Sequence, residues 1–212
     1  MNIKTLPDIS HNLKTYTIGS MEKTATGNFG ESWRQIIAPK LKARGIYVFD
    51  PTTMESQKTG MSTPEISAKI STWITSGHLV EFLQAMDSIW EGKTLLINDS
   101  LSPEDQILHL LGDYEYVLNS DFLILHYDKG DSWGGTLIEI AIAYYMAKIP
   151  IYLVTKDPIS GINKSALRHI LMSGVKRGDY KNHNPIFESF NQLLEYLDKT
   201  YGTKEKIDNE KK

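Results

Sequence analysis

Short apolar segments of strand length, separated by helical patterns, constrain the fold of this chain more than any other feature of its sequence. The clearest are Asp121–His126 (DFLILH) and Ile151–Thr155 (IYLVT), whose central residues are all apolar. Lys14–Gly19 (KTYTIG) and Ile46–Phe49 (IYVF) are β-branched and aromatic runs that end at turn-forming residues. Strands that are apolar on both faces are typical of parallel sheets covered by helices on both sides. We therefore predict an α/β fold with an open parallel sheet of the flavodoxin or Rossmann type.

Helical patterns fill the intervals between these strands. Thr136–Lys148 (TLIEIAIAYYMAK) is apolar nearly all round and is stopped by Pro150, so a buried helix is predicted there. The other predicted helices are Gly27–Arg44, Lys164–Met172 and Ile186–Tyr201. Because ligands of such folds bind at the carboxyl ends of the strands, we expect the functional site in the loops that follow them.

The stretch 52–112 lies between the second and third predicted strands and is the least regular part of the chain. It is predicted as a loop over 52–63, a helix from Pro64 capped by Thr63, a helix over His78–Trp90, and a helix from Ser102 to about Asn119. An α/β core does not need so long a connection. We therefore interpret 52–112 as a helical insertion beside the cleft, either a lid or a subunit contact.

The length of 212 residues fits a single α/β domain over 1–212, in which the charged residues 202–212 are predicted to be a disordered tail. The balance of 23 Lys and Arg against 26 Asp and Glu gives a net charge of −3, which argues against charge-driven binding to nucleic acid or to an anionic membrane. The absence of cysteine excludes disulfides, Cys-ligated zinc and thiol nucleophiles. No apolar run has the length of a membrane helix and the N-terminus does not resemble a signal peptide, so a cytoplasmic protein is expected.

Glu139 is the first candidate for catalysis, because it is the only charge between Asp131 and Lys148, in an otherwise apolar helix. A carboxylate in such surroundings is costly unless it is paired, hydrogen-bonded or functional. The alternative is structural, since Thr136 and Glu139 have the spacing of a capping box, in which the carboxylate binds the Thr136 N–H. The spacing alone favours the cap and leaves both interpretations open.

The loop Asp128–Gly135 (DKGDSWGG) joins the third strand to this helix and is rich in glycine. Backbone N–H groups in such a loop can approach an anion or a sugar, and Trp133 could stack on a base. The alternative is a flexible connection made of turn formers. The chain has neither a GxGxxG nor a P-loop pattern, so neither of those nucleotide sites is predicted.

Other candidates lie beside the first and third strands. Ser20, after Gly19 in the first turn, could bind a hydroxyl or a phosphate, with a plain turn as the alternative; Tyr16 lies within that strand, where packing is the commoner role. Asp113 could face the same cleft as Glu139, with a solvated helix charge as the alternative. Two carboxylates about one centre suit substitution at an anomeric carbon. The six histidines show no metal-binding spacing, so neither a metal nor a cofactor is expected.

In order and spacing, these segments resemble the nucleoside 2-deoxyribosyltransferase family and its nucleotide N-glycosidase relatives. The resemblance covers Lys14–Asp50, with TYTIGSMEK and GESWRQIIAPKLKARGIYVFDP, and Asp113–Thr155, with SDFLILHYDKGDSWGGTLIEIAIAYYMAKIPIYLV. It implies cleavage or transfer at the N-glycosidic bond of a 2′-deoxynucleoside or deoxynucleotide through a covalent glycosyl–glutamate intermediate. By this resemblance Glu139 is the nucleophile, Asp113 the acid that assists departure of the base, and Tyr16 the residue that holds the nucleophile.

The same resemblance implies a set of substrate contacts. The family has Asp or Ser six residues before the nucleophile, where this chain has Trp133, so Asp131 or Ser132 would contact the sugar. The Gly-Ser turn is similar to the nucleotide-hydrolysing branch, but Glu22 stands where that branch has arginine, which leaves nucleoside and 5′-monophosphate open. A neighbouring subunit helps to close the family's site, which implies a homo-oligomer. The implied substrate-binding residues are Gly19, Ser20, Asp131, Ser132, Trp133, Gly135 and Thr136.

Other functions stay open at the level of the sequence. A glutamate in an α/β sheet also serves hydrolysis of NAD or ADP-ribose glycosides. A non-catalytic nucleotide-binding module would need Glu139 only as a helix cap. The second step uses either a base or water, which would make the protein a transferase or a hydrolase, and the sequence favours neither.

Overall fold

A five-stranded parallel sheet forms the centre of the computed structural model, which describes residues 13–21, 31–92, 111–175 and 183–203. The strands are β1 (Leu13–Ile18), β2 (Ile46–Phe49), β3 (Phe122–His126), β4 (Ile151–Val154) and β5 (Ile186–Phe187). Their order in the sheet is β2-β1-β3-β4-β5, and every neighbouring pair is parallel. This is the strand order of flavodoxin-like folds, whose topological switch point lies between β1 and β3. The predicted open parallel α/β fold is confirmed.

Both faces of the sheet are buried, as the apolar strands predict. Alternate residues of β3 enter two separate cores, with Leu123 and Leu125 on one face and Phe122 and Ile124 on the other. None of these side chains is more than 1% exposed. Successive residues of a strand point to opposite faces, so burial on both faces requires an uninterrupted apolar run. This is why the pattern of β3 shows no polar alternation.

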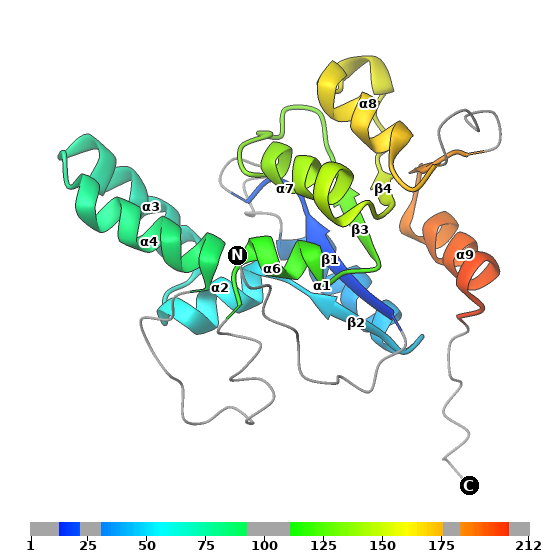
Figure 1. Cartoon of the computed structure of the whole chain (residues 1–212), viewed down its shortest axis with the longest axis horizontal. Helices are drawn as coiled ribbons and strands as arrows, with labels where there is room; N and C mark the ends of the chain where they lie inside the picture. The colour runs from blue at the N-terminus through cyan, green and yellow to red at the C-terminus, as the bar shows by residue number, and fades with distance from the viewer. Residues whose placement is uncertain (1–12, 22–30, 93–110, 176–182, 204–212) are drawn as a thin grey trace, which may run out of the picture.

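Helices cover both faces of the sheet (Figure 1). One face carries α1 (Glu31–Lys42) and α9 (Phe190–Tyr201), whose apolar stripes join the core of Phe122 and Ile124. The other face carries α6 (Asp113–Leu118), α7 (Thr136–Ile142), the π-helix η1 (Ala143–Ala147) that continues α7, the single turn η2 (Ile159–Gly161) and α8 (Lys164–Met172).

The predicted helix Thr136–Lys148 is present as α7 and η1, but the prediction that it is buried all round is wrong. Ile140 and Ala143 lie in the core, whereas the opposite side of the helix is open. Its exposed apolar residues are Leu137, Ile138, Tyr145 and Met146, with exposed fractions from 37% to 61%. The helix lies on the outer surface of the sheet between α6 and α8, so its neighbours leave one stripe uncovered.

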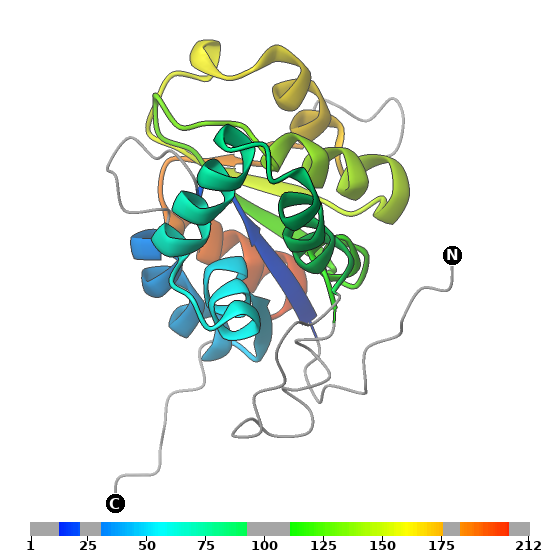
Figure 2. The same ribbon diagram turned by 90° about the vertical axis from the view of Figure 1, so that its left-hand side faces the viewer.

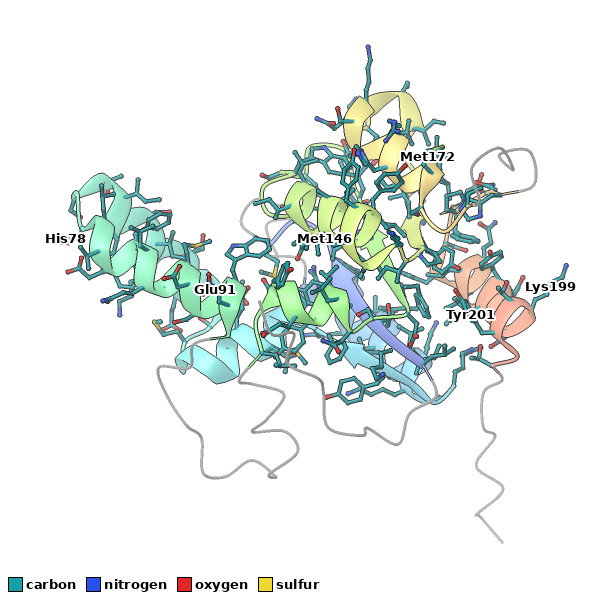
Figure 3. All side chains as sticks on the ribbon, in the orientation of Figure 1. His78, Glu91, Met146, Met172, Lys199 and Tyr201 are labelled. Atoms are coloured by element: carbon teal, nitrogen blue, oxygen red, sulfur yellow. The ribbon has the colours of Figure 1, made fainter. Side chains whose placement is uncertain are left out.

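The described part of the predicted insertion is mainly helical. Its helices are α2 (Pro51–Thr59), α3 (Thr63–Thr75) and α4 (Leu79–Glu91). The α3–α4 hairpin extends away from the sheet, with His78 at its far end and Glu91 near the body of the protein (Figures 1 and 3). Figure 2 looks along this hairpin toward the sheet.

The predicted loop over 52–63 is wrong, because most of it is helix α2. The Asp50 carboxylate accepts a hydrogen bond from the Thr52 N–H at 3.0 Å, and Pro51 occupies the first helical turn. Both are strong helix-start signals that outweigh the weak helical propensity of the polar residues behind them. The next helix, α3, begins at Thr63, so the residue predicted as its cap is helical and Ser62 is the cap.

Two further boundaries differ from the prediction. The helix start at Ser102 lies outside the described residues, but a continuous helix to Asn119 is wrong because α6 begins only at Asp113, with Gly112 as its N-cap. The predicted helix Ile186–Tyr201 divides into β5 and α9, separated by the cap Ser189, whose hydroxyl accepts the Gln192 N–H at 3.3 Å.

The described residues end at Thr203, directly after the Gly202 that follows α9. Most of the predicted tail, residues 204–212, lies outside them. Among the helices that the structure describes, none is both long enough and apolar enough to cross a membrane.

Candidate active site

A cavity of about 230 Å³ opens at the carboxyl ends of β1 and β3, at the topological switch point. One side is formed by the polar residues that follow or precede these strands, and the other by the helices of the insertion. The predicted site residues that line it are Gly19, Ser20, Asp113, Ser132, Trp133, Gly135, Thr136 and Glu139. The sheet topology therefore brings predicted site residues from three separate segments of the chain to one place.

Glu139 lies one turn into α7 and is 7% exposed. Burial raises the pKa of its carboxyl to about 8, and the nearby charge of Asp113 adds to the increase. The Arg34 guanidinium and the Tyr16 hydroxyl act in the opposite direction. Gly135 is the N-cap of α7 and Thr136 is its first helical residue, so the pair Thr136–Glu139 does not form the capping box that its spacing allowed.

Asp113 reaches the cavity because α6 runs back along the sheet and begins beside the ends of the strands. The carboxyl is 5% exposed, so the alternative of a solvated helix charge is wrong. Gly112 precedes it as the N-cap, and the Gly112 N–H donates to the Glu115 carboxylate at 2.9 Å. This second carboxylate fixes the first turn of the helix and with it the position of Asp113.

Tyr16 lies in β1 beneath the cavity and is fully buried. Its hydroxyl makes no hydrogen bond with the part of the chain that the structure describes. Burial raises the pKa of the hydroxyl well above its ordinary value, and the charges of Asp113 and Glu139 raise it further. A buried phenol that stays protonated between two carboxyl groups can donate a hydrogen bond to either of them.

The turn after β1 requires glycine at its first position. Gly19 has φ +146°, and a Cβ there would lie 2.9 Å from the backbone oxygen of His126. The Gly19 carbonyl accepts a hydrogen bond from Arg34 Nη2 at 3.3 Å. The turn can therefore approach the end of β3 closely and present Ser20, which is buried, to the cavity.

Only some residues of the loop after β3 line the cavity. Trp133 lines the cavity and stacks on Tyr127 with ring centroids 5.0 Å apart. Asp131 does not line the cavity, and its carboxylate instead accepts the Asp128 N–H at 2.9 Å. The predicted sugar contact of Asp131 is therefore not supported by its position, whereas Ser132 does reach the cavity.

Asp131 belongs to the one group of metal-binding side chains found among the described residues. It lies with His126 and Asp128, and their potential ligand atoms are all within 4.8 Å of one another. Burial lowers the pKa of His126, which favours the neutral imidazole. None of these three residues lines the cavity that contains Glu139.

Two charged residues at the site are absent from the sequence-based prediction. Arg34 is fully buried, and its Nη2 donates to the Thr17 and Gly19 carbonyl oxygens at 3.3 Å each. Its Nε lies 3.7 Å from the Asp50 carboxylate. Glu55, from α2, is 4% exposed and lines the cavity. The sequence does contain a pattern that indicates the burial of Arg34. Its spacing from Ile37 and Leu41, which are core residues, places all three on the same face of the helix.

The insertion supplies the apolar wall of the cavity. Its residues there are Ile66 and Ile70 from α3 and Met86, Ile89 and Trp90 from α4. The Trp90 ring lies against Gly135, where a Cβ would be 3.4 Å from the ring. The base of the hairpin therefore packs on the loop that leads to Glu139.

No protein-family model matches this chain, and neither does any curated protein. Two carboxyl groups line the cavity, a buried phenol lies close enough to interact with both, and the other wall of the cavity is apolar and aromatic. Such an arrangement can attack an electrophilic carbon, transfer a proton to a leaving group and hold a planar ring.

Proposed function

We propose that this protein is an enzyme that cleaves or transfers at the N-glycosidic bond of a 2′-deoxynucleoside or deoxynucleotide. The observation that carries the proposal is the convergence of Glu139 and Asp113 at one cavity bounded by two tryptophans, with the buried Tyr16 hydroxyl close enough to feel the charge of both carboxyl groups. A paired carboxyl site suits an oxocarbenium-like transition state, which a nearby carboxylate stabilises electrostatically. The apolar wall around Trp90 and Trp133 would hold the base.

The proposed reaction has two displacements at C1′ of the sugar. A carboxylate oxygen of Glu139 forms a bond to C1′ while the bond to the base nitrogen breaks, and Asp113 gives a proton to the departing base. The nitrogen of a second base, or a water oxygen, then attacks C1′ and releases Glu139. Asp113 takes the proton of the attacking group, which restores both carboxyl groups. Tyr16 would orient the Glu139 carboxylate by donating its hydroxyl proton.

The direct test is incubation of the purified protein with each 2′-deoxynucleoside, or its 5′-monophosphate, together with a different free base. We expect chromatography to detect exchanged product, or the free base and deoxyribose where water is the acceptor. Nicotinamide release from NAD serves as the comparison for the alternative glycosidic substrate. Neither exchange nor base release from any of the deoxy substrates would contradict the proposal.

The pH dependence of the reaction follows from the ionisation of Glu139. Only the carboxylate can attack, and burial raises its pKa to about 8, so the reactive fraction is small at low pH and grows as the pH rises. We expect kcat/KM to increase about tenfold per pH unit well below that value and to fall again at pH values where Asp113 has lost the proton that it gives to the departing base. Initial rates measured from about pH 5 to 9 check this, because kcat/KM reports the pKa values of the free enzyme. A flat profile over this range would count against Glu139 as the nucleophile.

A further inference from the structure

Glu55 is a buried charge at the cavity for which the proposed mechanism has no use. It lies one turn into α2, on the side of the helix that carries the buried residues Pro51 and Thr52. The side chain is 4% exposed and lines the cavity. Burial and the charges of Asp113 and Glu139 are the main causes that raise the pKa of the Tyr16 hydroxyl, and the Glu55 charge adds to them. The low exposure of Glu55 shows that it belongs to the buried part of the cavity lining.

With Glu55 included, carboxyl groups from three different helices line one small cavity. Glu55 comes from α2, Asp113 from α6 and Glu139 from α7. No lysine or arginine is among the described residues that line the cavity. The buried Arg34 donates to the Thr17 and Gly19 carbonyl oxygens and lies near Asp50. All three line a cavity of only about 230 Å³, so a molecule bound there would lie near these carboxyl groups. A bound molecule that displaces water from the cavity would lower the local dielectric constant. Charges on the molecule and on the carboxylates would then interact more strongly than they do in water.

We infer that Glu55 is a specificity-determining residue that restricts the cavity to uncharged nucleosides and rejects their 5′-monophosphates. A phosphate brings a charge of about −1.5 to −2 at neutral pH, and its oxygens only accept hydrogen bonds when ionised. A carboxylate also only accepts, so the two groups repel and cannot bond to each other. A sugar hydroxyl or a base N–H has a proton to donate to the same carboxylate. The inference rests on the proposed function and decides between its two substrate classes.

The test compares kcat/KM for one 2′-deoxynucleoside and its 5′-monophosphate in the wild type and in Glu55→Gln. Like charges placed together cost several kcal/mol, so we expect the wild type to prefer the nucleoside by about 100-fold or more. Glu55→Gln keeps the shape and removes the charge, and should narrow the preference about tenfold, mainly by lowering KM for the monophosphate. Glu55→Asp keeps the charge and should retain the preference. Glu195→Gln, an exposed position on α9, is the matched control and should change neither substrate.

A binding measurement separates this inference from the proposed function. Trp90 and Trp133 line the cavity, so quenching of tryptophan fluorescence reports binding of nucleoside and monophosphate without turnover. Preferential nucleoside binding that Glu55→Gln weakens supports the inference even where no product forms, and in that case the proposed function alone fails. Equal binding or turnover of the monophosphate by the wild type overturns the inference. It is also overturned if neither compound binds, or if Glu55→Gln, shown to be folded by circular dichroism, leaves the preference unchanged.

Discussion

Replacing Glu139 with glutamine is expected to reduce glycosidic bond cleavage by at least about 10⁴-fold, the order of loss seen when a nucleophile is removed. The amide has nearly the same shape as the carboxyl group but cannot form the ester bond to C1′. The residual rate would come from substrate binding and from the acid role of Asp113. Steady-state assays with the best substrate measure the loss, and Glu195→Gln, a surface substitution of the same type, should keep full activity.

Two further measurements on the same variant, taken together, distinguish loss of the nucleophile from loss of the fold. Mass spectrometry of the wild type with substrate should detect a deoxyribosyl adduct on the peptide that contains Glu139, and the glutamine variant should show none. Its unfolding transition should remain cooperative, because a neutral amide replaces a carboxyl that burial already penalises when charged. If the activity of Glu139→Gln were within tenfold of that of the wild type, the attack on C1′ would have to come from another group.

The strands of this fold are predictable because each carries its own signal. β2 coincides with its predicted range, β3 and β4 differ from theirs by one residue at one end, and β1 differs by one residue at each end. β5 carries no such signal, since it has two residues and exists through pairing with β4. Its neighbourhood is held by hydrogen bonds from the Leu153 N–H to the Pro185 oxygen at 2.8 Å and from the Thr155 N–H to the Phe187 oxygen at 2.9 Å. A strand made by tertiary contacts leaves little trace in the local pattern.

The residues of the candidate site likewise differ in how strongly the sequence indicates them. Glu139 draws attention because it is a charge inside an apolar helix, and the fold places it at a strand end where ligands bind. Glu55 gives no such signal, because its neighbours are polar and its burial depends on how α2 packs against the rest of the protein. Asp131 is the opposite case, since its N–H donates to the Asp128 oxygen at 3.0 Å and its side chain does not line the cavity. Loop direction is a property of the folded chain that residue spacing does not contain.

Replacing Gly112 with alanine is expected to destabilise the protein by about 3 kcal/mol, at the upper end of overpacking effects. A Cβ at this position would lie 2.1 Å from the Trp90 oxygen and 2.5 Å from the Gly92 nitrogen. Both are backbone atoms, so no side chain can rotate away and the end of α4 must move. The φ of Gly112 is −99°, which alanine adopts readily, so the effect comes from contact and not from backbone strain.

Urea unfolding measures the loss of stability, and Gly161→Ala is the control. A Cβ at Gly161 meets no atom within 4 Å, so that variant should stay within about 0.5 kcal/mol of the wild type. Equal stability of the two variants would show that α4 is not held against the start of α6 as described.

Gly112→Ala should also reduce activity, because Gly112 connects the insertion to Asp113 and the start of α6. Its N–H is bound by the Glu115 carboxylate, and the next residue is Asp113. A displaced α4 carries the Trp90 ring away from Gly135 and shifts the first turn of α6 at the same time. We therefore expect a lower kcat together with a higher KM in the folded variant, measured well below its midpoint of unfolding. A stability loss without any kinetic change would mean that the insertion packs beside the site without shaping it.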